Sequence, residues 1–213
     1  MITIHHLGVS QSERIIWLFE ELGLPYELKR YTRDPLTKLA PAEYKALHPM
    51  GTAPVVTDGD IVLAESGAII EYVIGKYANG RLALPPQHKN FADYLYWFHF
   101  ANGTMMPAQL VDLVVAWTGA PTDDETIRGV CGRTQLAWAQ VEKRLGKVPY
   151  FAGEDFTAAD IMMVFSLSTV RLFTPTEISK FPNTSAYLKR IGARPAYQRA
   201  MAKGDPEMAP VLS

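Results

Sequence analysis

The residues whose types and spacing could do chemistry lie between His48 and Tyr72. Ser66 stands at the predicted start of a helix, where unpaired backbone N–H groups and the helix dipole favour an anion such as a carboxylate. Pro54 precedes a short apolar strand, and a proline cannot donate to a strand ladder. A cis Ala53–Pro54 bond would suit that corner and would leave the backbone N–H and C=O of Ala53 free to pair with an extended ligand. Together these features could hold a small peptide by its backbone and its terminal carboxylate. The alternative is an ordinary hairpin followed by a capped helix.

Strands and helices that alternate along the first third of the chain must position this site. Residues 1–7 alternate apolar and polar side chains, which predicts a strand, and a second strand is predicted over 26–31. Ser10 with Glu13 three residues on predicts a capping box at the start of the helix between these strands. Asp58-Gly59 predicts a tight hairpin between two further short strands. With a helical turn before that hairpin and the helix after it, the predicted order is β-α-β-α-β-β-α.

The composition changes after residues 79–87, where glycine, asparagine and two prolines break the helix and strand periods and indicate a linker. Residues 89–117 are rich in aromatic side chains and are apolar on more than one face of a helix, which predicts burial on more than one side. Pro107 should kink or break this helix, because proline lacks the N–H that a helix interior needs. Residues 88–213 are therefore predicted to be all-helical.

Cap residues mark where the later helices begin. Thr122-Asp123-Asp124-Glu125 predicts the cap of a second long helix, which should run to about Leu145. Thr157, followed by Asp160 three residues later, predicts the cap of a third, apolar helix. Two shorter helices are predicted near 184–191 and 195–203.

Two segments resemble the glutathione S-transferase family. Gly51-Thr52-Ala53-Pro54-Val55-Val56 is similar to its Gly-Lys-Val-Pro segment, although Thr52 stands where many members carry lysine. Asp58-Gly59-Asp60 followed by Leu63-Ala64-Glu65-Ser66-Gly67-Ala68-Ile69 resembles its Asp-Gly-hydrophobic-Glu-Ser-x-Ala-Ile signature. The resemblance covers nearly the whole chain and implies an α+β fold. A thioredoxin-like glutathione-binding domain is expected over 1–78, a linker over 79–87, and an all-α helical bundle domain with the electrophile site and dimer contacts over 88–213.

The resemblance also implies how the thiol of glutathione is activated. A free thiol has a pKa near 8.5 and is mostly protonated at neutral pH, whereas the thiolate is the reactive species. Ser10-Gln11-Ser12-Glu13-Arg14 resembles the theta-like Ser-Gln-Pro-Ser-Arg segment. This places the activating hydroxyl on Ser10, with Ser12 as the next choice. The residues expected to contact glutathione, the co-substrate, are Thr52, Ala53, Pro54, Glu65 and Ser66.

Histidines and aromatic residues offer further candidates. His5 and His6 are adjacent on a strand, so at most one of them can face the site, and both could equally be structural. Methionine and aromatic side chains suit a broad apolar pocket for an electrophile, but they are equally ordinary core or dimer-contact residues. The candidates for this pocket are His6, Trp97, Phe100, Met105, Met106 and Trp117.

The resemblance implies a glutathione transferase that acts on an apolar electrophile, with glutathione peroxidase as a possible side activity. The alternative is a non-catalytic protein of the same fold that binds ligands or partner proteins. Glutathione-dependent disulfide reduction usually needs a cysteine at the first helix, and Cys131 is predicted to lie in the helical domain. A homodimer is expected, because one domain core can cover only some of the apolar faces of the 89–117 helix.

Composition excludes several other classes. The 213 residues carry 21 Lys and Arg against 22 Asp and Glu, which argues against a nucleic-acid binder. The single cysteine rules out an internal disulfide and any multi-cysteine zinc site, and no metal is expected. We see neither a signal peptide nor an apolar run long enough for a membrane span. A cytoplasmic protein without a membrane or nucleic-acid partner is therefore expected.

Overall fold

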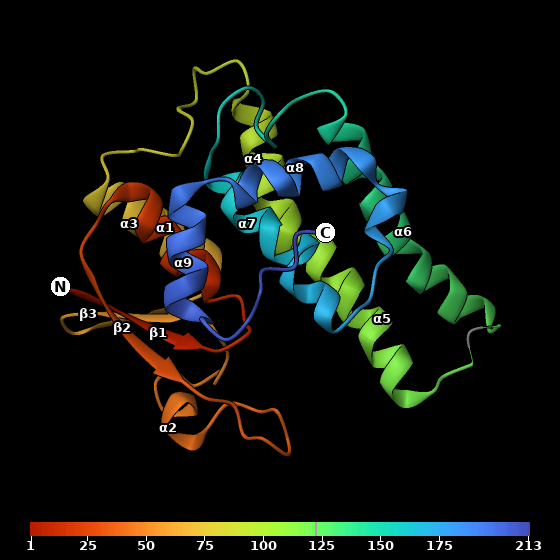
Figure 1. Cartoon of the computed structure of the whole chain (residues 1–213), viewed down its shortest axis with the longest axis horizontal. Coiled ribbons are helices and arrows are strands. Elements are labelled where there is room, and N and C mark those ends of the chain that lie inside the picture. Colours follow the sequence, from red (N-terminus) through yellow and green to blue (C-terminus); the bar gives the residue numbers. More distant parts are fainter. Residues whose placement is uncertain (122) are drawn as a thin grey trace. The chain divides into compact units, whose positions relative to one another are not determined.

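The computed structural model describes residues 1–121 and 123–213, and the chain divides into two compact units. The sheet unit comprises residues 1–83 and 192–210, and the helical unit comprises residues 84–191 and 211–213. Both units are drawn in Figure 1. The α+β class predicted from the sequence is confirmed, with a sheet in the first unit and helices in the second. Each unit is described by itself below.

The sheet unit contains a four-stranded sheet in the order β2-β1-β3-β4. Strand β1 pairs in parallel with β2, with Ile4 opposite Leu28, and antiparallel with β3, with Ile4 opposite Val56. The predicted order β-α-β-α-β-β-α is confirmed. The strands and helices of this part are β1 (Ile2–Leu7), α1 (Glu13–Leu22), β2 (Tyr26–Tyr31), α2 (Ala42–Lys45), β3 (Val55–Asp58), β4 (Ile61–Ala64) and α3 (Ser66–Tyr77).

Local chemistry explains where these elements begin and end. Helix α1 buries an apolar stripe that includes Ile15, Leu18 and Phe19, and it ends at Gly23, whose left-handed φ of 66° suits a residue without Cβ. The bond between Ala53 and Pro54 is cis, as the sequence predicted. The sheet unit therefore has the corner expected before β3.

The C-terminal helix α9 (Pro195–Gly204) packs against α1 in the sheet unit, as Figure 1 shows. Glu20 and Glu21 on α1 pair with basic residues that precede or lie on α9: Arg194 lies 2.7 Å from Glu21 and Arg199 lies 2.7 Å from Glu20. The rings of Trp17 and Tyr197 meet edge to face at 5.0 Å. Residues 192–210, which we expected in the helical domain, thus pack with the sheet because α9 carries charges and rings complementary to α1.

The helical unit is built on the long aromatic segment predicted over 89–117. That segment is three consecutive pieces rather than one helix, because a π-helical stretch, Ala101–Met105, interrupts it just before Pro107. Proline cannot donate to the preceding turn, and a π-helical turn is a common way to absorb such an interruption. The helices of this unit are α4 (Phe91–Phe100), α5 (Met106–Thr118), α6 (Glu125–Leu145), α7 (Ala158–Leu167) and α8 (Pro182–Gly192), with 3₁₀ turns at Thr169–Leu172 and Ile178–Lys180.

The caps of these helices test two sequence predictions. The capping box of Thr157 and Asp160 at α7 is confirmed, since both of its hydrogen bonds are formed. At α6 the cap is Asp124, whose carboxylate accepts from the N–H groups of Thr126 and Ile127 at 2.8 and 3.1 Å. Thr122, the first residue of the predicted cap, lies outside the described residues.

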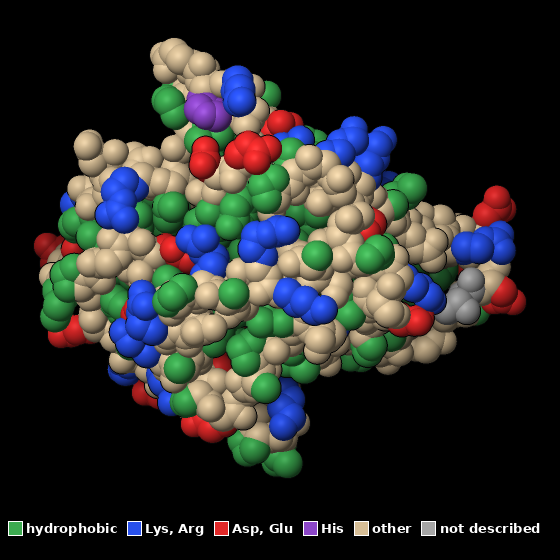
Figure 2. All heavy atoms as spheres, turned by 45° about the horizontal axis from the view of Figure 1, so that its top comes forward, with side chains coloured by type: hydrophobic (Ala, Val, Ile, Leu, Met, Phe, Trp, Pro, Cys, Tyr) green, Lys and Arg blue, Asp and Glu red, His purple; other side chains and the backbone are tan. Residues whose placement is uncertain are grey.

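Surface composition agrees with the balanced charge of the sequence. Figure 2 shows Lys and Arg side chains spread among Asp, Glu and apolar side chains on the face drawn. Among the described residues, no helix combines the length and the apolar character that crossing a membrane requires.

Candidate functional site

The loop between β1 and α1 carries the two serines that the sequence singled out. Ser12 is the residue before α1, and its side chain makes no cap hydrogen bond. The Ser10 hydroxyl accepts from the Ser12 N–H at 3.3 Å, and the capping box predicted for Ser10 and Glu13 stays a prediction. The Ser10 hydroxyl lies 2.6 Å from the Leu7 carbonyl and 2.7 Å from the Ser12 hydroxyl, so its one proton can go to either oxygen. The Ser12 hydroxyl faces strand β1, where it contacts His6 and accepts from the Leu7 N–H.

The hydrogen-bonded chain continues from Ser12 through His6 to a carboxylate. Ser12 Oγ lies 2.8 Å from His6 Nδ1, and His6 Nε2 lies 3.1 Å from Asp205 Oδ2. Because a carboxylate only accepts, His6 Nε2 must donate to it, and in the neutral ring Nδ1 is then an acceptor. The Ser12 hydroxyl therefore donates to His6, in a serine–histidine–aspartate arrangement that is buried throughout.

Asp205 also holds the loop backbone. Val9 has a φ of 52°, an outlier for a β-branched residue, and its N–H donates to Asp205 Oδ1 at 3.0 Å. Arg33 donates to the Gly8 carbonyl at 2.8 Å and to the Val9 carbonyl at 3.3 Å. Burial would raise the pKa of Asp205, but the hydrogen bonds from His6 and from the Val9 N–H, together with the charge of Arg30, outweigh burial and lower it. An ionised Asp205 is thus a stable anchor for the strained loop.

His5 faces the other side of the strand. Its Nδ1 lies 2.9 Å from the Tyr31 hydroxyl, and its Nε2 lies 3.2 Å from the Thr57 hydroxyl. Burial, and then the nearby charge of Lys29, lower the pKa of His5 and favour the neutral ring. The alternation of strand side chains therefore brings only His6 to the serines.

A second polar cluster lies at the start of α3. Ser66 is buried, and its hydroxyl accepts from Arg14 Nη1 at 3.3 Å and lies 3.5 Å from Gln11 Oε1. Arg14 also donates to Gln11. Burial lowers the pKa of Arg14 to about 9, against the opposing effect of Glu13, so the guanidinium is still protonated at neutral pH. A helix N-terminus beside a buried cation can hold an anion.

Glu65, the residue before Ser66, is exposed and has a left-handed φ of 71°. Strained positions of this kind cluster at binding sites. Thr52 is exposed, and Ala53 packs against the small core of Leu7, Tyr31, Tyr44 and Val55. The contacts of these residues with a ligand stay predictions.

The predicted electrophile residues differ in burial and belong to both units. Trp97, Phe100 and Met105 are buried in the helical unit, with Trp97 packed 4.9 Å from Phe100 and 5.0 Å from Phe151 between ring centres. Met106 is half-buried, whereas Trp117 is 74% exposed. His6 belongs to the sheet unit. Their role in an electrophile pocket stays a prediction.

Sequence reasoning missed Gln11, Arg14 and Asp205 as members of these clusters. Gln11 and Arg14 lie in the same short stretch as Ser10 and Ser12, so their proximity could have been inferred. Asp205 lies 199 residues from His6, and no local pattern marks it. Among the described residues, no three His, Cys, Asp or Glu side chains gather as metal ligands.

Comparisons with known proteins agree with this geometry. A family model described as the glutathione S-transferase N-terminal domain matches residues 10–74, and one described as the C-terminal domain matches residues 123–195. Glutathione S-transferase 3 of Schizosaccharomyces pombe is 32% identical over 218 residues, which cover 95% of this chain and 88% of that protein.

Solved structures give the same result. A glutathione S-transferase from Actinobacillus pleuropneumoniae is 36% identical with a TM-score of 0.87, covering 100% of this chain and 99% of that one. A theta class glutathione S-transferase from Xanthomonas axonopodis pv. citri, solved with glutathione bound, is 28% identical with a TM-score of 0.70, covering 93% and 96%.

Proposed function

The chain belongs to the glutathione S-transferase family and is a glutathione transferase, and we propose that it joins glutathione to an apolar electrophile with Ser10 as the residue that stabilises the thiolate. The observation that carries the proposal is the hydrogen-bonded chain from Ser10 through Ser12 and His6 to Asp205. A donor aimed at the sulfur favours the thiolate and lowers the pKa of the thiol. The thiol proton leaves to water, the sulfur forms a bond to the electrophilic carbon, and any leaving group departs with its electron pair.

Ser10 is favoured over Ser12 because of where each proton goes. The Ser12 proton is committed to His6 Nδ1, and Ser12 has no exposed surface. Ser10 is 6% exposed, and its one proton has two acceptors, the Leu7 carbonyl and the Ser12 hydroxyl. A rotation about the Cα–Cβ bond of Ser10 redirects that one proton to a sulfur, whereas redirecting the proton of Ser12 would leave His6 Nδ1 without a donor.

We assign the γ-glutamyl end of glutathione to the start of α3. Its carboxylate is matched by the Ser66 hydroxyl and N–H and by the buried charge of Arg14, 3.3 Å from that hydroxyl. Its amino group is matched by the exposed carboxylate of Glu65. The backbone of Ala53 pairs with the middle of the peptide, and Thr52, in place of a lysine, adds no charge there. The related Xanthomonas structure, solved with glutathione bound, supports the choice of ligand.

We also propose that the protein is a homodimer. Large apolar side chains on α4 and α5 are exposed, including Tyr96 at 53% and Leu110 at 57%, and a second copy could cover them. Peroxidase side activity and location in the cytoplasm stay predictions.

The first prediction concerns Ser10→Ala. Loss of a hydrogen bond to a charged group costs about 1.5–3 kcal/mol, which corresponds to a rise of about one to two units in the thiol pKa of bound glutathione. Turnover of a chloro-nitroaromatic at neutral pH should fall more than glutathione affinity, and raising the pH should recover part of the rate. Thiolate absorbance and the pH–rate profile measure both effects. Ser12→Ala is the matched control, and an unmoved pH profile in Ser10→Ala would exclude Ser10 as the donor.

The second prediction concerns Ser66→Ala. Removing the hydroxyl should weaken glutathione binding by roughly 1.5–3 kcal/mol, the size of one hydrogen bond to a charged group. Titration calorimetry measures the affinity, and the thiol pKa of bound glutathione should stay the same because the sulfur lies elsewhere on the peptide. Ser185→Ala, on α8 of the helical unit, is the control. Unchanged affinity in Ser66→Ala would remove this residue from the site.

The third prediction concerns Asp205→Asn. An asparagine can still accept from the Val9 N–H, but its amide can donate to His6 Nε2, which reverses the direction of hydrogen bonding along the chain. We expect the turnover number to fall by about fivefold, the effect of one misplaced hydrogen bond worth about 1 kcal/mol, with little change in glutathione affinity. Glu207→Gln, which removes a surface pair with Arg30, is the control. Equal turnover in both variants would show that the Asp205 carboxylate does not position His6 for the reaction.

The fourth prediction concerns assembly. Light scattering at micromolar concentration should give about twice the 23.7 kDa mass of one chain. Leu110→Glu should shift the protein toward the mass of one chain, because a charge would be placed on the apolar contact. A single-chain mass for the unaltered protein contradicts the dimer.

A further inference from the structure

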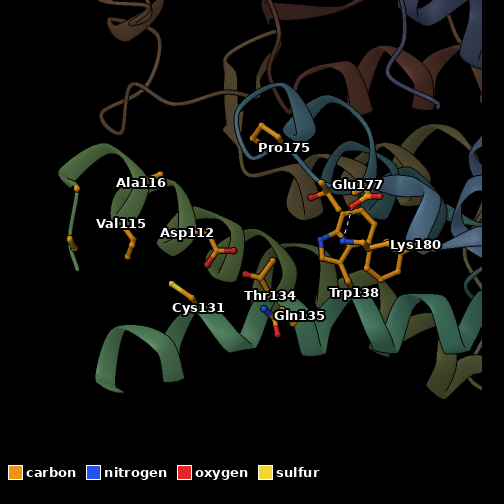
Figure 3. A pocket seen from close by; sticks show the side chains of 14 residues that line it. Asp112, Val115, Ala116, Cys131, Thr134, Gln135, Trp138, Pro175, Glu177 and Lys180 are labelled. Atoms are coloured by element: carbon orange, nitrogen blue, oxygen red, sulfur yellow. Dashed lines mark ion pairs between the residues drawn. The ribbon is translucent and has the colours of Figure 1, made fainter. Parts of the chain in front are cut away.

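The helical unit contains a cavity of about 690 Å³, a size typical of small-molecule sites. It lies between α5, α6 and the segment from Pro175 to Phe181, as Figure 3 shows. Every residue that lines it belongs to the helical unit. None of the residues predicted for the electrophile pocket lines it. The cavity is therefore independent of the polar chain around Ser10.

Three polar atoms in its walls are buried and, within the described part of the chain, have no hydrogen-bond partner. They are Asp112 Oδ1, Thr134 Oγ1 and Trp138 Nε1. Trp138 is 2% exposed, and Figure 3 shows Asp112 and Thr134 entering the same hollow from facing helices. Buried polar atoms are nearly always hydrogen-bonded, so a group of them around one cavity indicates a missing partner.

The other residues that line the cavity indicate the shape and charge of that partner. Trp138 stacks on Phe181 with ring centres 4.9 Å apart, and Val115, Ala116 and Ala120 add apolar surface. At the rim, Lys180 and Glu177 pair at 2.7 Å, so their charges cancel. The carboxylate of Asp112 is left as the unbalanced charge. A flat apolar molecule with a donor group fits these walls.

Cys131 lies in the same cavity, and its chemistry favours reversible binding. Burial, and then the neighbouring carboxylate of Asp112, raise the pKa of the Cys131 thiol. The thiolate is the nucleophilic form of cysteine, so this thiol is poorly reactive at neutral pH. Cys131 is the single cysteine of the chain, which makes it a specific reporter of the cavity.

We propose that this cavity is a second ligand site, which binds a flat aromatic molecule whose N–H or O–H group donates to Asp112 and whose acceptor atom receives the Trp138 N–H. The chemistry that recognises the ligand is one ring face against Trp138, one donor and one acceptor. Glutathione is not part of this site, so the test of the site does not depend on whether the proposed function is correct.

The test uses 6-aminoquinoline, which carries an amine donor and a ring-nitrogen acceptor, and quinoline, which lacks the donor. Titration calorimetry on the whole protein, with saturating glutathione present, should show one saturable site for 6-aminoquinoline and binding about fivefold weaker for quinoline. Trp138→Phe keeps a ring but removes the N–H, and it should weaken the binding of 6-aminoquinoline by about fivefold. Equal affinity for the two probes would overturn the assignment of Asp112.

A pair of tryptophan substitutions locates the binding. Ala116→Trp fills the cavity from α5 and should abolish binding, whereas Ala139→Trp, on an exposed position of α6 outside the cavity, should not. In the unaltered chain, 6-aminoquinoline should slow alkylation of Cys131 by iodoacetamide, which tests the site without any variant. Absence of saturable binding, or binding that neither blocks Cys131 nor responds to Ala116→Trp, would overturn the proposal.

Discussion

The carboxylate of Asp205 is the contact on which the rest of the site depends. One of its oxygens accepts from the Val9 N–H and the other accepts from His6 Nε2, so a single group fixes both the strained backbone of the loop and the ring that engages Ser12. A β-branched residue at positive φ persists only where its surroundings compensate for the strain. Helix α9 provides that compensation, because its ion pairs with α1 hold the segment that leads to Asp205.

Many elements of both units follow from local rules, whereas the functional loop of the sheet unit does not. Three features could be predicted because each depends on residues a few positions apart: the alternation along β1, the Asp58-Gly59 hairpin and the Thr157–Asp160 cap. The serine and glutamate spacing before α1 also satisfies a local rule, and the Ser10 hydroxyl does accept from the Ser12 N–H. There the Ser12 hydroxyl binds His6, which lies outside the motif. A partner 199 residues away, such as Asp205 for His6, leaves no signal in one sequence.

The helical unit shows a different limit. Aromatic side chains at helical spacing identified α4 and α5, but a helix that is apolar on several faces does not tell which face enters the core. Trp97 and Phe100 were assigned to a pocket and are buried, whereas Trp117 from the same segment is exposed. Likewise, the polar walls of the cavity near Trp138 come from α5 and α6 together, so neither helix alone predicts them.

The direction of the hydrogen bonds explains how a serine could serve as a thiol activator in the proposed mechanism. A serine hydroxyl has a single proton, which is useful to a sulfur only if no stronger acceptor holds it. The Ser12 proton is used by His6, so Ser12 cannot also donate to the sulfur. The Leu7 carbonyl lies 2.6 Å from the Ser10 hydroxyl and 3.3 Å from the Ser12 hydroxyl. The Leu7 carbonyl therefore keeps a polar neighbour when Ser10 turns away. A donor already held at the right place needs little reorganisation, and this preorganisation is what makes electrostatic stabilisation effective in enzymes. The Ser10 hydroxyl also accepts from the Ser12 N–H, so one group serves both the backbone before α1 and the buried chain, and a local rule describes only part of its role, as is common at functional sites.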